Sequence, residues 1–248
     1  MSSTEILPSN IILNPEDRKF PDFSLTRLLS SVFDPTEGCR ICILTDFEDP
    51  SKEMKGFKFL QSPEKFPVQA KAYKEFFCEL KDGVMNELGM SGGEMFAYHA
   101  TNGSNLDMKD ECFDVDSSAL SLDQNIYSEY DIILCISDWS ATAPLTTKCK
   151  EFGFRGATMH GLNDIILNSG LSVDYDQVSS DTEKLRLAMT GADEIEIDFT
   201  LNDNRTVTIK LILDGQEAQK SHGLCKGSAP DIANLPAGDV YFVPVDAV

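Results

Sequence analysis

Residues 131–137 are Asp-Ile-Ile-Leu-Cys-Ile-Ser, an uninterrupted apolar run bounded by the polar side chains of Asp131 and Ser137. A strand that is apolar on both faces is typical of the centre of a parallel sheet, because helices then cover the sheet on both sides. A helical pattern follows at 144–152, with Pro144 in its first turn and Gly153 after its end. This stretch therefore predicts a central strand of an α/β domain.

A β-α-β unit precedes that strand. Residues 40–46 (Arg-Ile-Cys-Ile-Leu-Thr-Asp) have the composition of a buried strand, and 94–100 (Glu-Met-Phe-Ala-Tyr-His-Ala) that of a second one. Between them, apolar residues recur every four positions from Val68 to Leu88, and Gly89 supplies a helix stop. Such units usually build a parallel sheet with a right-handed crossover.

Shorter elements complete the first three quarters of the chain. Residues 23–32 predict a helix, 155–159 a short strand and 163–167 a helical turn, whereas the polar stretch 101–125 predicts a long excursion. Ser180-Asp181-Thr182-Glu183 fits a capping box, which predicts that a helix spans 182–189.

The periodicity changes near residue 190. Apolar and polar residues alternate over 194–201 and again over 207–213, which predicts a half-buried antiparallel hairpin, and 240–245 predicts a last strand. The predicted fold class is therefore α/β. A Rossmann-like domain with a parallel sheet (residues 1–190) precedes an antiparallel β segment that begins a second domain (residues 191–248).

Composition limits the classes of function. The 248 residues include 41 acidic and 21 basic ones, which gives a net charge of -20. Such a chain repels nucleic-acid phosphates and anionic membrane surfaces, so neither partner is expected. No signal peptide or apolar stretch long enough for a membrane span is evident, and an odd number of cysteines, seven, argues against a disulfide framework. These features predict a soluble, cytoplasmic protein.

Two loops next to predicted strand ends bear on ligand binding. The acidic residues 46–49 follow the first strand and would repel a pyrophosphate, which disfavours dinucleotide binding. Residues 137–142 follow the central strand and contain Trp139, the chain's one tryptophan. Ligands of open α/β sheets often bind at this position, and the structural alternative is a capped helix start with a packed indole.

The sharpest metal-ligand candidate is Asp239, because Pro236 and Gly238 flank it in a turn that can direct a carboxylate outward from a strand. Considered alone, Asp239 fits better as a turn residue that caps a strand. The three histidines, His99, His160 and His222, do not have zinc-site spacing, although His222 precedes the last strand and is a candidate neighbour of Asp239.

The segment Asn234-Leu235-Pro236-Ala237-Gly238-Asp239-Val240-Tyr241, together with 183–188, the hairpin, Gly223 and Pro244, resembles the thermophilic metallo-aminopeptidases (aminopeptidase T and aminopeptidase S, the leucyl aminopeptidases). The resemblance covers mainly residues 180–246. That family has an N-terminal α/β domain and a C-terminal domain with a two-metal site, and its N-[LM]-P-x-G-E-V segment supplies a glutamate ligand. The matching residue here is Asp239, which is shorter by one methylene group.

The resemblance implies metal-assisted hydrolysis of the N-terminal residue of a peptide, with zinc, cobalt or manganese as the divalent metal. The family's other ligands lie downstream of the matching segment, so we expect residues 191–248 to form an incomplete metal-binding domain and this chain alone to be inactive. Two alternatives are a non-catalytic binding or interaction module and an iron-dependent ring-opening dioxygenase on the same scaffold. An unfinished sheet edge also invites pairing, which makes a homodimer an expected assembly.

Overall fold

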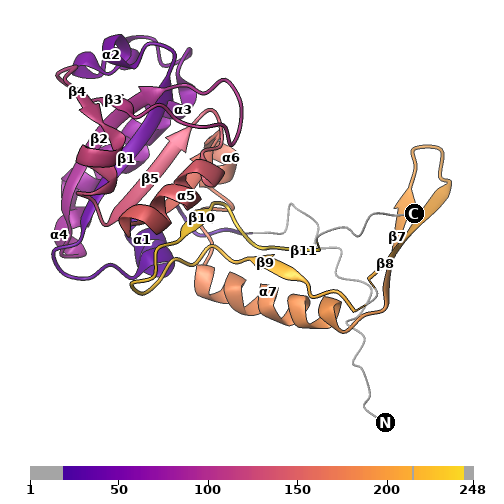
Figure 1. Cartoon of the computed structure of the whole chain (residues 1–248). Coiled ribbons are helices and arrows are strands. Elements are labelled where there is room, and N and C mark those ends of the chain that lie inside the picture. Colours follow the sequence, from indigo (N-terminus) through magenta and orange to yellow (C-terminus); the bar gives the residue numbers. More distant parts are fainter. Residues whose placement is uncertain (1–18, 214, 243–248) are drawn as a thin grey trace.

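The computed structural model describes residues 19–213 and 215–242, which are built around a seven-stranded sheet with the order β10-β6-β5-β1-β2-β3-β4 (Figure 1). The first five strands of this order are parallel, and the two at the other edge are antiparallel. The predicted α/β class with a small antiparallel part is confirmed. The sheet strands are β1 (Arg40–Phe47), β2 (Ser91–His99), β3 (Glu111–Phe113), β4 (Ala119–Ser121), β5 (Ile132–Ser137), β6 (Arg155–His160) and β10 (Ile232–Asn234).

Helices alternate with the strands along the chain, and they begin and end at local sequence signals. Ser24 caps α1, Pro67 opens α3, and Gly153 ends α5 in the left-handed conformation that glycine adopts without strain. The helical elements are α1 (Leu25–Phe33), α2 (Pro50–Glu53), η2 (Lys55–Gln61), α3 (Pro67–Ala72), η3 (Tyr73–Cys78), η4 (Leu80–Val84), α4 (Met85–Glu87), η5 (Leu122–Tyr127), α5 (Thr142–Phe152), α6 (Asp164–Leu167) and α7 (Tyr175–Thr190).

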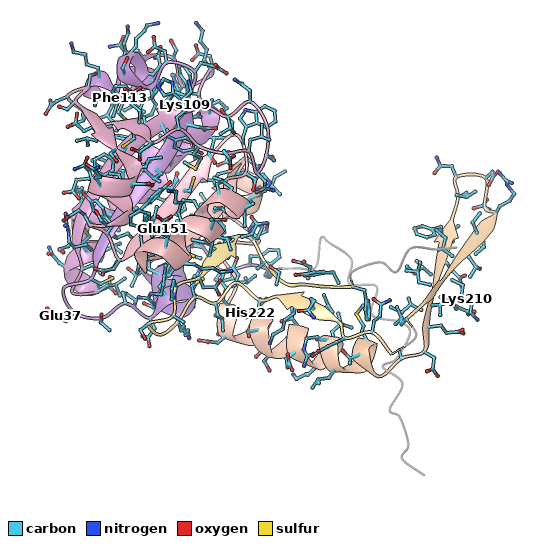
Figure 2. All side chains as sticks on the ribbon, in the orientation of Figure 1. Glu37, Lys109, Phe113, Glu151, Lys210 and His222 are labelled. Atoms are coloured by element: carbon cyan, nitrogen blue, oxygen red, sulfur yellow. The ribbon has the colours of Figure 1, made fainter. Side chains whose placement is uncertain are left out.

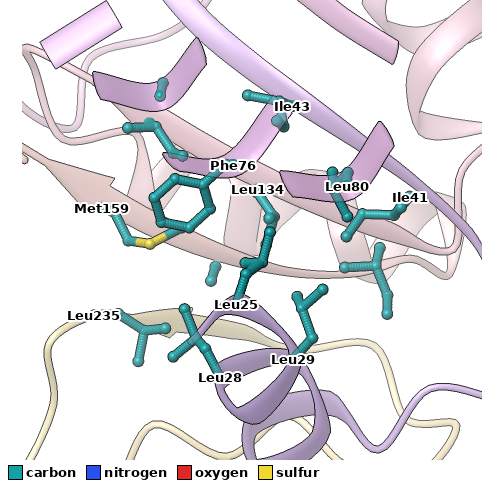
Figure 3. Packing of buried hydrophobic residues seen from close by; sticks show 14 of the residues in the cluster. Leu25, Leu28, Leu29, Ile41, Ile43, Phe76, Leu80, Leu134, Met159 and Leu235 are labelled. Atoms are coloured by element: carbon teal, nitrogen blue, oxygen red, sulfur yellow. The ribbon is translucent and has the colours of Figure 1, made fainter. Parts of the chain in front are cut away.

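Alternate residues of the central strands pack into two separate cores. On β1, Ile41 and Ile43 face the larger core, which α1 and the α3–α4 region cover, whereas Cys42 and Leu44 face a smaller core under η5 and α5. Figure 3 shows the larger core, where Leu28 and Leu29 of α1 approach the sheet. Burial on both faces explains why the central strands are continuously apolar.

A second part of the chain extends away from the sheet along α7 (Figure 1). It contains the hairpin of β7 (Glu194–Thr200) and β8 (Thr206–Ile212), and the antiparallel pair of β9 (Gln219–Ser221) and β11 (Asp239–Tyr241). The hairpin is confirmed, but the prediction that it is half-buried is wrong for the described residues. Its apolar side chains, such as Phe199 (45% exposed) and Ile209 (44% exposed), face solvent, because no described element packs on that face.

The chain returns to the main sheet after the hairpin. Ile232–Asn234 forms β10, which pairs in parallel with β6 in the register Ala233↔Ala157, and Leu235 beyond it is buried in the larger core. The boundary predicted at residue 190 stays a prediction, but the segment beyond that residue contributes both a strand and core side chains to the α/β unit. Of the predicted last strand, 240–245, residues 243–245 lie outside the described part of the chain.

Two further observations concern membrane-spanning helices and the cysteine thiols. No helix in the described ranges is long and apolar enough to cross a membrane. All seven cysteines are free thiols and six of them are buried, so Cys39 and Cys42 do not form a disulfide here.

Candidate functional site

The strand order reverses between β1 and β5. The connection from β1 leads to β2 on one side, whereas the later strands β5, β6 and β10 are placed on the other side. At such a switch point the loops leave in opposite directions from the carboxyl ends of two adjacent parallel strands and open a crevice in which ligands of α/β proteins bind. The residues at these ends are Asp46 of β1 and Asp138, which directly follows β5.

Asp46 is a carboxylate held almost completely inside the protein, with 1% of its surface exposed. Its Oδ1 atom accepts a hydrogen bond from the backbone N–H of Asp138 at 2.8 Å, and Oδ2 accepts one from the N–H of Trp139 at 3.3 Å. The loop after β5 is therefore wrapped around this carboxylate, which fixes the loop to the end of β1.

The surroundings of Asp46 favour its protonated form. Burial raises the pKa of the Asp46 carboxyl from an ordinary value of 3.8 to about 6, and the nearby charge of Asp138 acts in the same direction. The N–H groups of Asp138 and Trp139 and the amide of Gln69 stabilise the charged form and limit the rise. A pKa that burial and a neighbouring charge raise toward neutral pH is a feature of functional sites.

Gln69 of α3 joins the two carboxylates. Its Nε2 atom donates to Asp46 Oδ1 at 3.1 Å, to the Asp46 carbonyl oxygen at 2.9 Å and to Asp138 Oδ2 at 2.9 Å. Gln69 is 1% exposed, and its Oε1 atom has no hydrogen-bond partner among the described residues. A buried acceptor without a donor costs free energy, so Gln69 holds the two carboxylates together at the cost of one unsatisfied oxygen atom.

A chain of hydroxyl and amide groups connects this switch point to the Asn234–Val240 segment. Ser140 Oγ lies 3.1 Å from Thr142 Oγ1, which lies 2.7 Å from Thr158 Oγ1, and Thr158 Oγ1 donates to Asn234 Oδ1 at 3.3 Å. The loop after β5 and the segment that resembles the metallo-aminopeptidases are thus held in one polar network at the carboxyl end of the sheet.

Asp239, the predicted metal ligand, begins β11 and is exposed, with Ser221 of β9 as its strand partner. Within the described residues, no group of three or more His, Cys, Asp and Glu side chains is arranged to hold a metal ion. The structure therefore places Asp239 at the surface without bringing further ligands to it, and its role as a ligand stays a prediction.

The histidines have other partners. His99 Nε2 pairs with Glu111 Oε2 at 3.0 Å, and His160 is exposed at the end of β6. His222, labelled in Figure 2, accepts a hydrogen bond at Nδ1 from the Leu224 N–H. Burial lowers the pKa of His222, and the charges that act on it come from Lys220, Asp231 and Glu183 rather than from Asp239.

Two hollows lie apart from the switch point. One, of about 490 Å³, lies between α1, η3 and α6 and is lined by the carboxylates of Asp22, Glu75, Glu79 and Asp164 together with a few apolar side chains. The other, of about 230 Å³, lies between η5 and α5, where Lys148 pairs with Asp123 across its wall at 2.8 Å. Their linings are exposed surface residues, some of whose carboxylates pair with lysines, whereas Asp46 is buried, so the switch point remains the stronger candidate.

The sequence pointed to part of this site. The loop 137–142 was identified by its position after a central strand, and the structure confirms that position. Asp46 was seen as a residue that repels phosphate, not as a member of a site, and Gln69 was missed. A signal for Gln69 exists, because it occupies the apolar face of its helix, in line with Ala72, Phe76 and Leu80.

Comparisons of the chain with protein-family models, with curated proteins and with solved structures found no significant match. The functional proposal below therefore depends on the resemblance of residues 234–241 described above and on the geometry of this chain.

Proposed function

We propose that this chain is a metallo-aminopeptidase-like protein whose described part is the substrate-binding α/β portion and supplies one carboxylate, Asp239, toward a metal site. The observation that carries the proposal is the way the Asn234–Val240 segment is built into the fold. Asn234 ends a strand of the main sheet, Leu235 is buried in the larger core, and Asp239 starts a new strand at the surface.

Each residue type in the segment suits its position. Gly238 has a φ of 130°, which glycine adopts readily, and a side chain there would approach Val178 of α7 to 3.2 Å. The backbone N–H of Gly238 donates to the carbonyl of Ser221 at 2.9 Å. The turn is thus fixed against both α7 and β9. The Asp239 carboxylate therefore extends from a rigid backbone, which a metal ligand requires.

The described residues do not by themselves fit a two-metal centre, because they provide one carboxylate where such a centre needs several ligands. We therefore derive no catalytic step through a metal. Under the proposal, zinc, cobalt or manganese would bind with ligands from outside the described residues, and the chain alone does not release amino acids from peptides.

The proposal is tested by site-resolved metal binding. Mn²⁺ broadens the amide NMR signals of nearby residues even when it binds weakly to a single carboxylate, so we expect stronger broadening at 237–241 and 219–221 than around Asp231. Asp239→Asn should abolish that local maximum. Asp231→Asn, which removes another exposed carboxylate eight residues before Asp239, should leave it unchanged.

Broadening that is no stronger around Asp239 than around Asp231 would contradict the role of Asp239. A steady release of leucine from a leucyl peptide by the chain with Zn²⁺, Co²⁺ or Mn²⁺ would contradict the expected inactivity.

A second candidate function is ligand binding without catalysis. It is supported by the switch point between β1 and β5, where the Asp46 carboxylate is buried, the buried Gln69 amide that bonds to it keeps an unpartnered oxygen, and Trp139 of the next loop is exposed. The two candidates differ in their need for metal, because binding at the switch point uses only the residues already present there.

A further inference from the structure

We propose that the apolar face of the β7–β8 hairpin is a self-association surface, on which the same face of a second copy of this chain packs. The face consists of the exposed apolar side chains at alternate positions of the hairpin: Ile197, Phe199, Leu201, Val207, Ile209 and Leu211. The inference is independent of the metallo-aminopeptidase-like function, because it involves neither Asp239 nor a metal.

The first argument is that the hairpin has the pattern of a sheet with a missing layer. The six side chains of the apolar face are each 38–46% exposed. On the opposite face, Lys210 (labelled in Figure 2) pairs with Glu194 at 2.6 Å and with Glu196 at 3.5 Å. An antiparallel sheet with one polar and one apolar face ordinarily packs its apolar face on another layer, and two strands alone are marginally stable in water.

The second argument is charge, which restricts the surfaces through which two copies can meet. A chain with a net charge of -20 repels its own copies at most contacts. The charged residues of β7 and β8 all alternate with the apolar ones and therefore lie on the opposite face: Glu194, Glu196, Asp198 and Lys210. Two apolar faces can thus pack together without bringing carboxylates into contact.

The third argument is geometry. The cross-strand pairs Ile197↔Ile209 and Phe199↔Val207 give the face a similar apolar pair at successive levels. Such a layer can stack on a copy of itself about 10 Å away, as the two sheets of a sandwich do, and the same surface is then used by both copies. Figure 1 shows the hairpin at the far end of α7, away from the seven-stranded sheet, so two hairpins can stack without a clash between the sheets.

The area of the face fits a specific but weak dimer. A large apolar residue has roughly 200 Å² of surface when fully exposed, so the six side chains present about 500 Å² per chain. Exposed apolar patches of this size are at the upper end for monomers. Two such faces bury about 1,000 Å², which is the lower limit for a specific interface, so we expect a dissociation constant of about 1–100 μM.

Sedimentation equilibrium of the full chain tests the inference over protein concentrations of about 0.5–300 μM. We expect the weight-average mass to rise from that of one chain to that of two. Raising the NaCl concentration from about 0.15 to about 0.5 M should leave the dissociation constant unchanged or lower it, because salt screens the repulsion between two acidic chains and does not weaken apolar contacts.

A pair of variants identifies the surface. Ile197→Lys should raise the dissociation constant roughly tenfold or more, because it places a charge in the middle of the apolar face. Thr200→Lys is the matched control, since it adds the same charge to the opposite face of the same strand and should leave the dissociation constant nearly unchanged. Both side chains are exposed in the single chain, so circular dichroism should show that both variants are folded.

The dye ANS gives a second measurement at the face itself. It binds the exposed face of single chains, and a second copy covers the same side chains, so the ANS fluorescence per chain should fall as the protein concentration passes through the dissociation constant. Ile197→Lys should not show this fall.

A chain that stays monomeric up to about 300 μM would overturn the inference. ANS binding by that monomer would mean that the face serves a different partner, and a lack of ANS binding would mean that another part of the chain covers it. A dimer that salt weakens, or that Ile197→Lys and Thr200→Lys affect alike, would equally overturn it, because another surface then joins the copies. The assay contains no metal, so its failure leaves the metal proposal standing, and failure of the Mn²⁺ experiment leaves this one standing.

Discussion

Asp46 couples the stability of the fold to pH in a direction that is unusual for a carboxylate. Its folded pKa of about 6 lies above the ordinary value of 3.8, so between these values the folded protein holds a proton that the unfolded chain has lost. The free energy of unfolding contributed by Asp46 is therefore fully present below about pH 4 and is lost as pH rises to about 6. A shift of roughly two units corresponds to about 3 kcal/mol.

This prediction is checked by urea unfolding of the chain and of Asp46→Asn at several pH values between about 4 and 8. The other acidic groups also titrate in this range, so the informative quantity is the difference between the two proteins. We expect that difference to shift in favour of Asp46→Asn as pH rises, and then to level off above about pH 7. A difference that does not vary with pH would show that the Asp46 carboxyl titrates normally.

The sequence predicts the place of a site residue where that residue comes directly after a strand or helix that is itself predictable. The loop 137–142 was found because the strand before it is uniformly apolar. The pairing of Asp46 with Gln69 could not be foreseen, because 23 residues separate them and only the packing of α3 on the sheet brings them together. The unpartnered Oε1 atom of Gln69 is likewise a property of the packed fold.

At the scale of elements, α7 shows how a good local motif can mislead. Ser180-Asp181-Thr182-Glu183 fits a capping box, but the helix begins at Tyr175, where the Asp174 side chain accepts hydrogen bonds from the N–H groups of Asp176 and Gln177. Thr182 then lies inside the helix and donates to the Val178 carbonyl. The Asp174 cap and the burial of Tyr175 against the larger core extend the helix by two turns beyond the motif.

The hairpin β7–β8 gives the clearest element-scale prediction. Its pairs Ile197↔Ile209 and Phe199↔Val207 form one apolar face, whose side chains are 38–45% exposed. A continuous exposed apolar face binds the dye ANS. We expect the chain to bind ANS in the folded state, and Ile197→Lys to reduce the fluorescence by roughly half or more, because a charge in the middle divides the face.

Thr200→Lys is the control for that measurement, since Thr200 pairs with Thr206 on the polar face of the same hairpin and its replacement adds the same charge. Equal loss of ANS fluorescence in both variants would mean that charge alone, and not the apolar face, governs dye binding.

At the scale of the whole molecule, the return of the chain to the sheet was the least predictable feature. β10 has three residues, Ile232–Asn234, in a stretch without strand periodicity, and its pairing with β6 joins segments more than 70 residues apart. Local patterns do not encode such a pairing. The order of the inner strands, by contrast, follows from β-α-β units whose components are all visible in the sequence.

This return strand predicts unequal effects of two deletions. Ending the chain at residue 190 removes β10 together with Cys225, Ala233 and Leu235, which are buried in the larger core. It also leaves the Arg155 guanidinium, which donates to the Cys225 carbonyl at 2.9 Å, without that partner. Each large buried side chain contributes about 2–5 kcal/mol, against a typical total stability of about 5–15 kcal/mol. We therefore expect the truncated chain to be unfolded or molten.

Replacing only residues 195–211 by an Asn-Gly turn should have little effect on the sheet, because the hairpin packs on no described element and its ends meet at Glu194 and Ile212.

Thermal unfolding followed by near-ultraviolet circular dichroism distinguishes the two deletions through the tertiary signals of Trp139 and the buried tyrosines. If residues 19–190 instead unfold cooperatively near the temperature of the full chain, the boundary at residue 190 separates independent domains and β10 contributes little. A cooperative transition only in the hairpin-deleted protein would show that residues before and after 190 form one folding unit, with the hairpin as its appendage.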